Sequence, residues 1–166
     1  MKILNKKYIV VLLLLTMFTA KSNAQILKAE IRALGLTCSM CSNAINKQLE
    51  SLPDVKSIDI DLNTNTFIVT LSDSNSLLPS VFKDKVENAG FFIGSLILTV
   101  SSETVFKSPY IIIKDSVGQQ KQVEIEVLDK GYVTAKRFKK VSKLYKNVET
   151  FNENNENDFH VLIINE

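Results

Sequence analysis

The chain of 166 residues contains two cysteines, Cys38 and Cys41, in the segment Gly-Leu-Thr-Cys-Ser-Met-Cys at positions 35–41. Two thiols at this spacing can bind one metal ion, exchange disulfides with another protein, or form a disulfide with each other. The single histidine, His160, lies near the C-terminal end of the sequence. The chemistry of the chain is therefore expected to depend on the elements that hold these two thiols and on the compartment around them.

A strand is expected before the cysteines and a helix after them. Apolar and charged residues alternate over 26–33, and apolar residues recur at helical spacing over 39–52. The apolar side of the strand consists of Leu27, Ala29, Ile31 and Ala33. Unpaired N–H groups and the helix dipole lower the pKa of a cysteine at a helix N-terminus. We expect Cys38 in the loop and Cys41 in the first helical turn, so that both thiols lie in this field.

Strand and helix patterns continue to residue 100. They predict a strand over 55–62, a turn at 63–65, a strand over 67–72, a helix over 78–89 and a strand over 91–100. With the first strand and helix, this order is the split βαβ, or ferredoxin-like, arrangement. In the last strand, one face is expected to hold Phe92, Leu96, Leu98 and Val100, and the other Ile93 and Ile97. Because this strand lies at a sheet edge in such a fold, we expect residues 101–166 to cover it.

Four short motifs carry a resemblance to a known family. They are the cysteine loop at 35–41, Leu-Pro-Asp-Val at 52–55, Leu-Asn-Thr-Asn-Thr at 62–66 and Glu-Asn-Ala-Gly-Phe at 87–91. Residues 26 to about 98 thereby resemble the heavy-metal-associated domain, the module of copper chaperones, metal-exporting ATPases and the periplasmic mercury-binding protein. The resemblance implies that Cys38 and Cys41 are metal ligands, with Cys38 the more exposed. It also implies that the ion passes between proteins by exchange of thiolate ligands.

Three neighbouring positions bear on this loop. Leu36 stands where the family usually has Met, and a Leu of similar volume is expected to pack under the loop. Phe91 stands where related proteins carry Tyr, Phe or Lys beside the metal loop, which implies a shielding role. An ordinary core aromatic residue at a strand start is an equally good interpretation of Phe91. Met40, between the cysteines, is expected to point to solvent rather than to the ion.

Soft ions suit a site of two thiolates. Cu(I) is expected first, with Hg(II) and Ag(I) next. A closed Zn(II) site needs four ligands, so carboxylates or a second molecule would have to complete it here. The expected partners are a metal ion and a metal-transporting ATPase or another protein that donates or accepts the metal.

Other functions use the same cysteines. A periplasmic thiol–disulfide redox protein also places Cys-x-x-Cys between a strand and a helix, but this chain has no Trp, and its element order differs from that of thioredoxins. A structural disulfide between Cys38 and Cys41 is the second alternative, and a metal sensor or a binding partner of a transporter is the third. The sequence shows no Ser/His/Asp set, phosphate-binding glycine loop or zinc-protease motif, so we expect a binding protein and not an enzyme.

The N-terminus has the pattern of a signal peptide. Three lysines precede an apolar run over 8–20, and small residues stand at 22 and 24, so residues 1–24 are expected to be removed. A retained membrane anchor is the alternative, and it would be the only contact with a membrane. Of 20 basic and 18 acidic residues, removal takes away four lysines and leaves 16 basic residues, a balance that does not favour nucleic-acid binding. The expected location is periplasmic or secreted.

No family resemblance is identified for residues 101–166. The patterns predict strands over 106–114, 122–129 and 159–164, turns at 117–120 and 130–131, and a polar loop over 152–158. A further strand is expected to start at Tyr132-Val133, and 136–146 fits a helix with a basic outer face. That face could contact an acidic partner or an anionic membrane, although a solvated surface is favoured. The predicted fold class is α+β, a ferredoxin-like βαββαβ domain at 25–100 followed by a small, mostly antiparallel β unit at 101–166.

Overall fold

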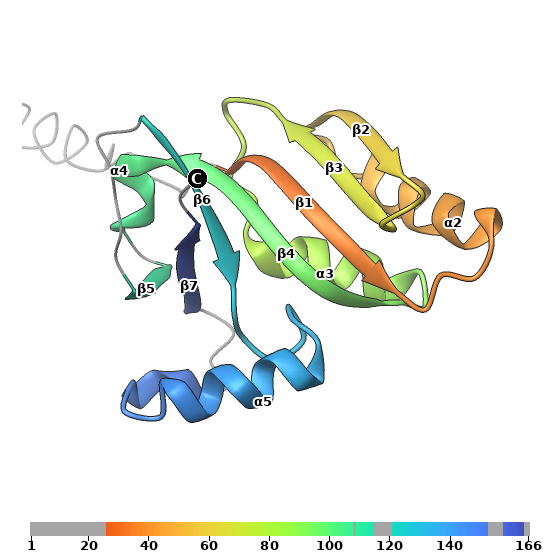
Figure 1. Ribbon diagram of the computed structural model, residues 1–166. Coiled ribbons are helices and arrows are strands. Elements are labelled where there is room, and N and C mark those ends of the chain that lie inside the picture. Colours follow the sequence, from red (N-terminus) through yellow and green to blue (C-terminus); the bar gives the residue numbers. More distant parts are fainter. Residues whose placement is uncertain (1–25, 108, 115–120, 153–157, 165–166) are drawn as a thin grey trace, which may run out of the picture.

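A computed structural model describes residues 26–107, 109–114, 121–152 and 158–164 (Figure 1). In chain order the elements are β1 Ile26–Leu34, α2 Ser39–Glu50, β2 Val55–Asp61, β3 Thr66–Leu71, α3 Pro79–Asn88, β4 Phe92–Ser101, α4 Ser102–Val105, β5 Tyr110–Lys114, β6 Gln122–Val127, α5 Ala135–Leu144, the 3-10 helix η1 Glu149–Asn152 and β7 Phe159–Ile164. The predicted signal peptide, the turn at 117–120 and most of the polar loop lie outside the described residues. No helix in the described ranges is long and apolar enough to cross a bilayer.

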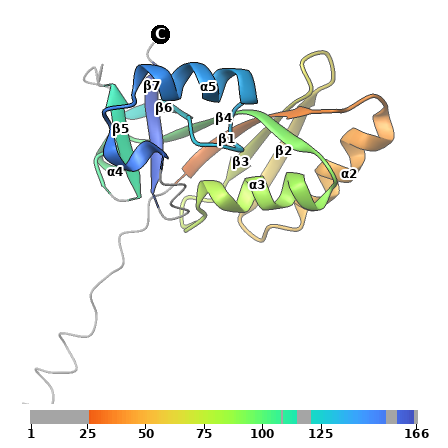
Figure 2. The same cartoon turned by 90° about the horizontal axis from the view of Figure 1, so that it is seen from below.

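The first half folds as a βαββαβ unit, as predicted. Strands β2, β3, β1 and β4 are neighbours in this order, and all three pairings are antiparallel. Helices α2 and α3 cover one face of these strands (Figure 2). The buried side chains between the helices and the sheet include Ala29, Ile31, Phe67, Val69, Ile45, Leu49, Phe82 and Val86. The ferredoxin-like fold is therefore confirmed.

Two bulges reverse the side-chain faces that simple alternation predicts. In β1, the register shifts between Ile26 and Lys28, so that Ile26 is buried in the core and Leu27 is not. In β4, Ala33 pairs with Ile93 but Arg32 pairs with Ser95, which leaves Gly94 as the extra residue. Ile93 consequently faces the core, and Phe92 is 68% exposed. The predicted positions of Leu27, Phe92 and Ile93 were wrong because a bulge shifts the two-residue alternation by one.

Gly94→Ala is expected to lower the free energy of unfolding by about 1–3 kcal/mol, because a Cβ would overpack the bulge. That atom would lie 2.8 Å from Cδ2 and 2.9 Å from Cγ of Leu34, and 3.4 Å from the carbonyl oxygen of Arg32. Denaturant unfolding measures the loss. In a Leu34→Ala background the same substitution should cost less, and equal costs in both backgrounds would contradict this account.

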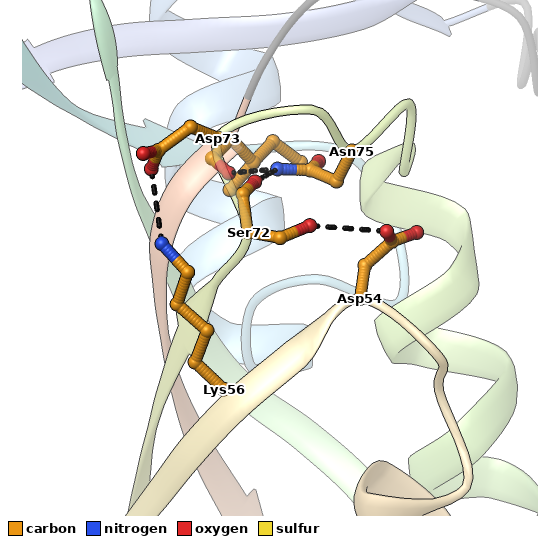
Figure 3. Close-up of polar contacts among 6 residues, drawn as sticks. Asp54, Lys56, Ser72, Asp73 and Asn75 are labelled. Carbon is orange, nitrogen blue, oxygen red and sulfur yellow. Dashed lines mark hydrogen bonds and ion pairs between the residues drawn. The ribbon is translucent and has the colours of Figure 1, made fainter.

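The buried amide of Asn75 holds the connection between β3 and α3 at the start of β1 (Figure 3). Its Nδ2 donates to the carbonyl oxygen of Ile26 at 2.7 Å and to that of Ser72 at 2.5 Å. The Ser72 hydroxyl donates to Asp54 at 3.0 Å, and Lys56 pairs with Asp73 at 3.2 Å. The bond to Ile26 thus ties this connection to the end of β1 that is opposite to the cysteine loop, and the other two contacts join the start of β2 to the end of β3.

The second half extends the same sheet. Strand β6 pairs antiparallel with β4, and the full order is β2-β3-β1-β4-β6-β7-β5. Leu98 lies opposite Ile125 and Val100 opposite Val123, and all four side chains are buried in one core that both halves share. The prediction that residues 101–166 cover the edge of β4 is confirmed. Since β4 itself runs to Ser101, the division into two domains at residue 100 stays a prediction.

Parts of the second half differ from the predicted elements. The strand expected from 106 begins at Tyr110, and the short helix α4 precedes it. Tyr132 and Val133 do not start a strand: Tyr132 lies in a turn, Val133 forms an isolated bridge with Lys130, and α5 begins at Ala135. The ring of Tyr132 packs edge-on against that of Phe159, with centroids 5.8 Å apart. Strand β5 pairs parallel with β7, while β6 pairs antiparallel with both its neighbours.

Helix α5 lies on the face of the sheet opposite to α2 and α3 (Figure 2). It covers a second, smaller core of buried residues, Leu128, Val133, Val141 and Phe151. Phe138, Tyr145 and Leu162 pack against this core from its edges. The pattern at 136–146 is thus a helix, whose residues Phe138, Val141 and Tyr145 pack on this core, while Leu144 is exposed.

Candidate metal centre

The turn between β1 and α2 places both cysteines at a helix N-terminus. Gly35 follows the strand with φ +87, a conformation that side chains with a Cβ rarely adopt. Cys38 is the N-cap residue of α2 with an extended backbone, and Cys41 lies in the first helical turn, as predicted. The amide of Cys41 donates to the carbonyl oxygen of Cys38 at 3.1 Å. The backbone therefore holds the two thiols side by side.

The sulfur atoms of Cys38 and Cys41 lie 2.6 Å apart, and both cysteines are free. Cys38 is exposed and Cys41 is half-buried, so the predicted order of exposure is confirmed. Within the residues that the structure describes, no group of three or more His, Cys, Asp or Glu side chains could hold a metal. The site thus offers two sulfurs, and their role as ligands stays a prediction.

The pKa of the Cys41 thiol is lowered, chiefly by its hydrogen bond with Cys38 and next by the backbone amide of Thr37. Hydrogen bonds to the charged form stabilise the thiolate. The thiolate is the form that binds metal and attacks disulfides. The lowered pKa of Cys41 therefore favours both reactions.

Cys38→Ala is expected to return the pKa of Cys41 toward its ordinary value, because the largest cause of the lowering is then lost. The lowered pKa means that Cys41 stays a thiolate to lower pH in the native loop than in the variant. The measurement is the rate of alkylation of Cys41 against pH. Met40→Leu is the control, because Met40 is 81% exposed and should leave the profile unchanged. An identical profile in Cys38→Ala would exclude Cys38 as the cause.

The underside of the loop rests on the core. Leu36 is partly buried and packs against the core, as predicted for this position. Phe91 is also partly buried there, and its Cδ1 lies 3.8 Å from the position of a Cβ at Gly35. Phe91 thus packs in the core and borders the start of the loop, and its role in shielding a metal stays a prediction. Met40 points to solvent, as expected.

A pocket of about 340 Å³ opens beside Cys38, between the loop and the β2–β3 turn. It is lined by Leu36, Thr37, Cys38, Ser39, Ser42, Leu62 and Asn65. Asp61 accepts hydrogen bonds from the amide of Asn63 and the hydroxyl of Thr64, and the Asn65 carbonyl oxygen accepts one from the Ala33 amide. These hydrogen bonds hold the β2–β3 turn in place as one wall of the pocket. The sequence showed this turn as a motif but gave no sign that it faces Cys38.

His160 belongs to a separate, buried network. Its Nδ1 lies 2.7 Å from Asp129 and its Nε2 lies 2.8 Å from the hydroxyl of Thr150. Asp129 also accepts from the backbone amide of His160 at 2.7 Å. Sequence reasoning missed this set because Asp129 lies 31 residues from His160. The ring is 1% exposed and stacks edge-on with Phe151, so we interpret the network as structural.

Asp129→Ala is expected to lower the free energy of unfolding by about 2–4 kcal/mol, because both oxygens that accept from His160 are lost and each buried donor left unpaired costs about 1–3 kcal/mol. Denaturant unfolding measures the change. Asp54→Ala is the matched control: Asp54 accepts from one side chain, the hydroxyl of Ser72, so this substitution should cost about 1 kcal/mol or less. Equal costs for the two substitutions would contradict this role of Asp129.

Comparison with known proteins finds a family match within the first half. Residues 30–92 match the family model of the heavy-metal-associated domain. A copper-transporting ATPase of Saccharomyces cerevisiae is 42% identical over 57 residues, which cover 34% of this chain and 6% of that protein. A copper-exporting P-type ATPase of Staphylococcus haemolyticus is 34% identical over 64 residues, which cover 39% of this chain and 8% of that protein. The chain spans less than a tenth of the length of either relative.

Two solved structures are also similar. The yeast copper transporter domain, solved in apo and Cu(I) states, is 36% identical and covers 40% of this chain and 90% of its own, with a TM-score of 0.36. The CopZ metallochaperone is 26% identical and covers 40% of this chain and 97% of its own, with a TM-score of 0.37.

Proposed function

We propose that the protein, whose residues 30–92 match the family model of the heavy-metal-associated domain, binds one soft metal ion, Cu(I) first, through Cys38 and Cys41. The observation that carries the proposal is the pair of free thiols, 2.6 Å apart at the N-terminus of α2. The role of the protein is to carry, deliver or sequester this ion outside the cytoplasm. The two curated relatives, both copper ATPases by name, support copper as the cargo.

Counting the ligands favours Cu(I) over Zn(II). Two thiolates without further ligands suit a soft monovalent ion, while a closed Zn(II) site needs four ligands. Hg(II) and Ag(I) share the softness of Cu(I) and are the next candidates. Each thiol loses a proton when it binds the ion, so binding weakens as the pH falls.

Transfer of the ion would begin at the exposed cysteine. A partner thiolate that enters the pocket beside Cys38 adds to the bound ion, and the bond from Cys38 breaks, after which Cys38 takes up a proton. The bond from Cys41 breaks next, and the ion leaves with the partner's ligands. The lowered pKa of Cys41 favours its thiolate as the last ligand to be released. A metal-transporting ATPase or another metal donor or acceptor is the partner that this exchange requires.

The test is retention of Cu(I) by the reduced protein against a competing chelator. We expect one ion per chain, and none in the double variant Cys38→Ser/Cys41→Ser. Oxidation with a mild disulfide-forming reagent should abolish retention, and reduction should restore it. Retention that survives the double substitution would place the site elsewhere and refute the proposal.

The alternative is a thiol–disulfide redox protein that uses the same cysteines. The close contact of the two sulfurs and the lowered pKa of Cys41 favour it. Disulfide exchange with a reduced or oxidised glutathione buffer, at a potential in the range of known oxidoreductases, together with no Cu(I) retention, would support the redox protein and exclude the carrier.

A further inference from the structure

Helix α5 and its flanks carry an unusual concentration of positive charge. Residues 130–148 contain seven basic residues and no acidic one, so that all 18 acidic residues of the chain lie elsewhere. The exposed basic side chains are Lys130, Lys136, Lys139, Lys140, Lys143 and Lys146. We call Lys136, Lys139, Lys140, Lys143 and Lys146 the lysine face.

Packing of α5 turns the lysine face to solvent. The opposite side of the helix packs on the second core through Phe138, Val141 and Tyr145. Arg137 is the one arginine of this stretch, and its guanidinium pairs with Glu126 of β6 at 2.7 Å. The outer surface of α5 therefore presents lysines, on the side of the sheet away from α2 and α3 (Figure 2).

The lysine face is expected to destabilise α5. Lysines at i, i+3 and i+4 repel one another along its length. The first turn of α5 contains no acidic residue, although acids there would be favoured by the helix dipole. Thr134 caps the N-terminus of α5 through the Arg137 amide, and Lys143 in the last turn suits the helix dipole, so the helix is held in spite of the repulsion. A row of like charges that is kept on one helix face is expected where the positive field itself has a use.

We propose that the lysine face binds the surface of an anionic phospholipid bilayer. Lysines near such a surface each add to the attraction, and the field needs no shaped pocket. Leu144 is 66% exposed at the margin of the lysine face, where it can contact the interface. Carboxylates of an acidic protein are bound best by arginine, whose planar guanidinium can donate two hydrogen bonds to one carboxylate. The arginine of this stretch, Arg137, is already paired with Glu126. The proposal is independent of metal binding, and it replaces the solvated surface that the sequence favoured.

The experiment is co-sedimentation with vesicles, using the protein as recovered from cells after any N-terminal processing. Vesicles of phosphatidylglycerol and phosphatidylethanolamine are compared with neutral phosphatidylcholine. The variant Lys136→Gln/Lys140→Gln/Lys143→Gln is expected to bind the anionic vesicles roughly 100-fold more weakly at low salt. Its matched control is Lys107→Gln/Lys114→Gln/Lys121→Gln, which removes the same charge from exposed positions elsewhere and should bind as the unmodified protein does.

Binding of the unmodified protein should fall as salt rises, because counterions screen the charges. Circular dichroism should show that both variants are folded. Equal loss of binding in the two variants, or no preference for anionic vesicles, would overturn the proposal. Binding to soluble polyglutamate without binding to vesicles would assign the face to an acidic protein and overturn it as well.

Discussion

Cys41→Ser is expected to weaken Cu(I) binding by more than about 100-fold. Loss of a residue that only hydrogen-bonds to a metal ligand already costs about 10–100-fold, and loss of the ligand itself should cost more. A serine hydroxyl is a hard, weakly acidic ligand and does not replace a thiolate on a soft ion. Since no other candidate ligand group lies among the described residues, the ion would keep one strong ligand. Competition titration with a Cu(I) chelator measures the affinity.

Cys38→Ser should weaken binding as strongly, because each thiolate supplies half of the ligand set. Cys38 is exposed and Cys41 is half-buried, so neither substitution should greatly change the free energy of unfolding. Met40→Leu serves as the control within the same loop and should leave the affinity unchanged, since Met40 points to solvent. Full affinity in either serine variant would show that the loop is not a two-sulfur site.

The fragment 25–100 is expected to be less stable than the full chain, by several kcal/mol, and to self-associate. Removal of β6 leaves the β4 edge unpaired, and it exposes Leu98 and Val100, which now face a core continued by β6 and β7. Each large apolar side chain that becomes exposed costs about 1.5–3 kcal/mol. Denaturant unfolding measures the stability, and analytical ultracentrifugation measures the association.

A second fragment separates the two effects. Ile97 lies on the outer face of β4, opposite Glu126, and a lysine there should block edge-to-edge pairing. The fragment with Ile97→Lys is expected to be monomeric but still less stable than the full chain. If the unmodified fragment were monomeric and as stable as the full chain, the two halves would be independent domains, and the shared core would contribute little.

The candidate site was predictable because its parts are close in the sequence. A strand pattern, a glycine, two cysteines and a helix pattern follow one another within about 25 residues, so local backbone preferences decide where the thiols lie. The pocket beside Cys38 was not predictable, since its second wall comes from the β2–β3 turn. The His160 network escaped for the same reason, because its members come together only when β7 pairs with β6.

By itself, the sequence determined the order of the elements from β1 to β4, the ferredoxin-like class and the place of both cysteines at the start of α2. These follow from hydrophobic periodicity and turn residues, which act over a few neighbouring positions. Only the tertiary structure decided the pairing of β6 with β4, the side of the sheet that α5 covers, and the bulge at Gly94 that turns Phe92 outward. These features depend on packing between residues far apart in the chain. Strand pairing and the choice of the buried face are determined together, because a shift of one residue in register turns every side chain of a strand to the other face.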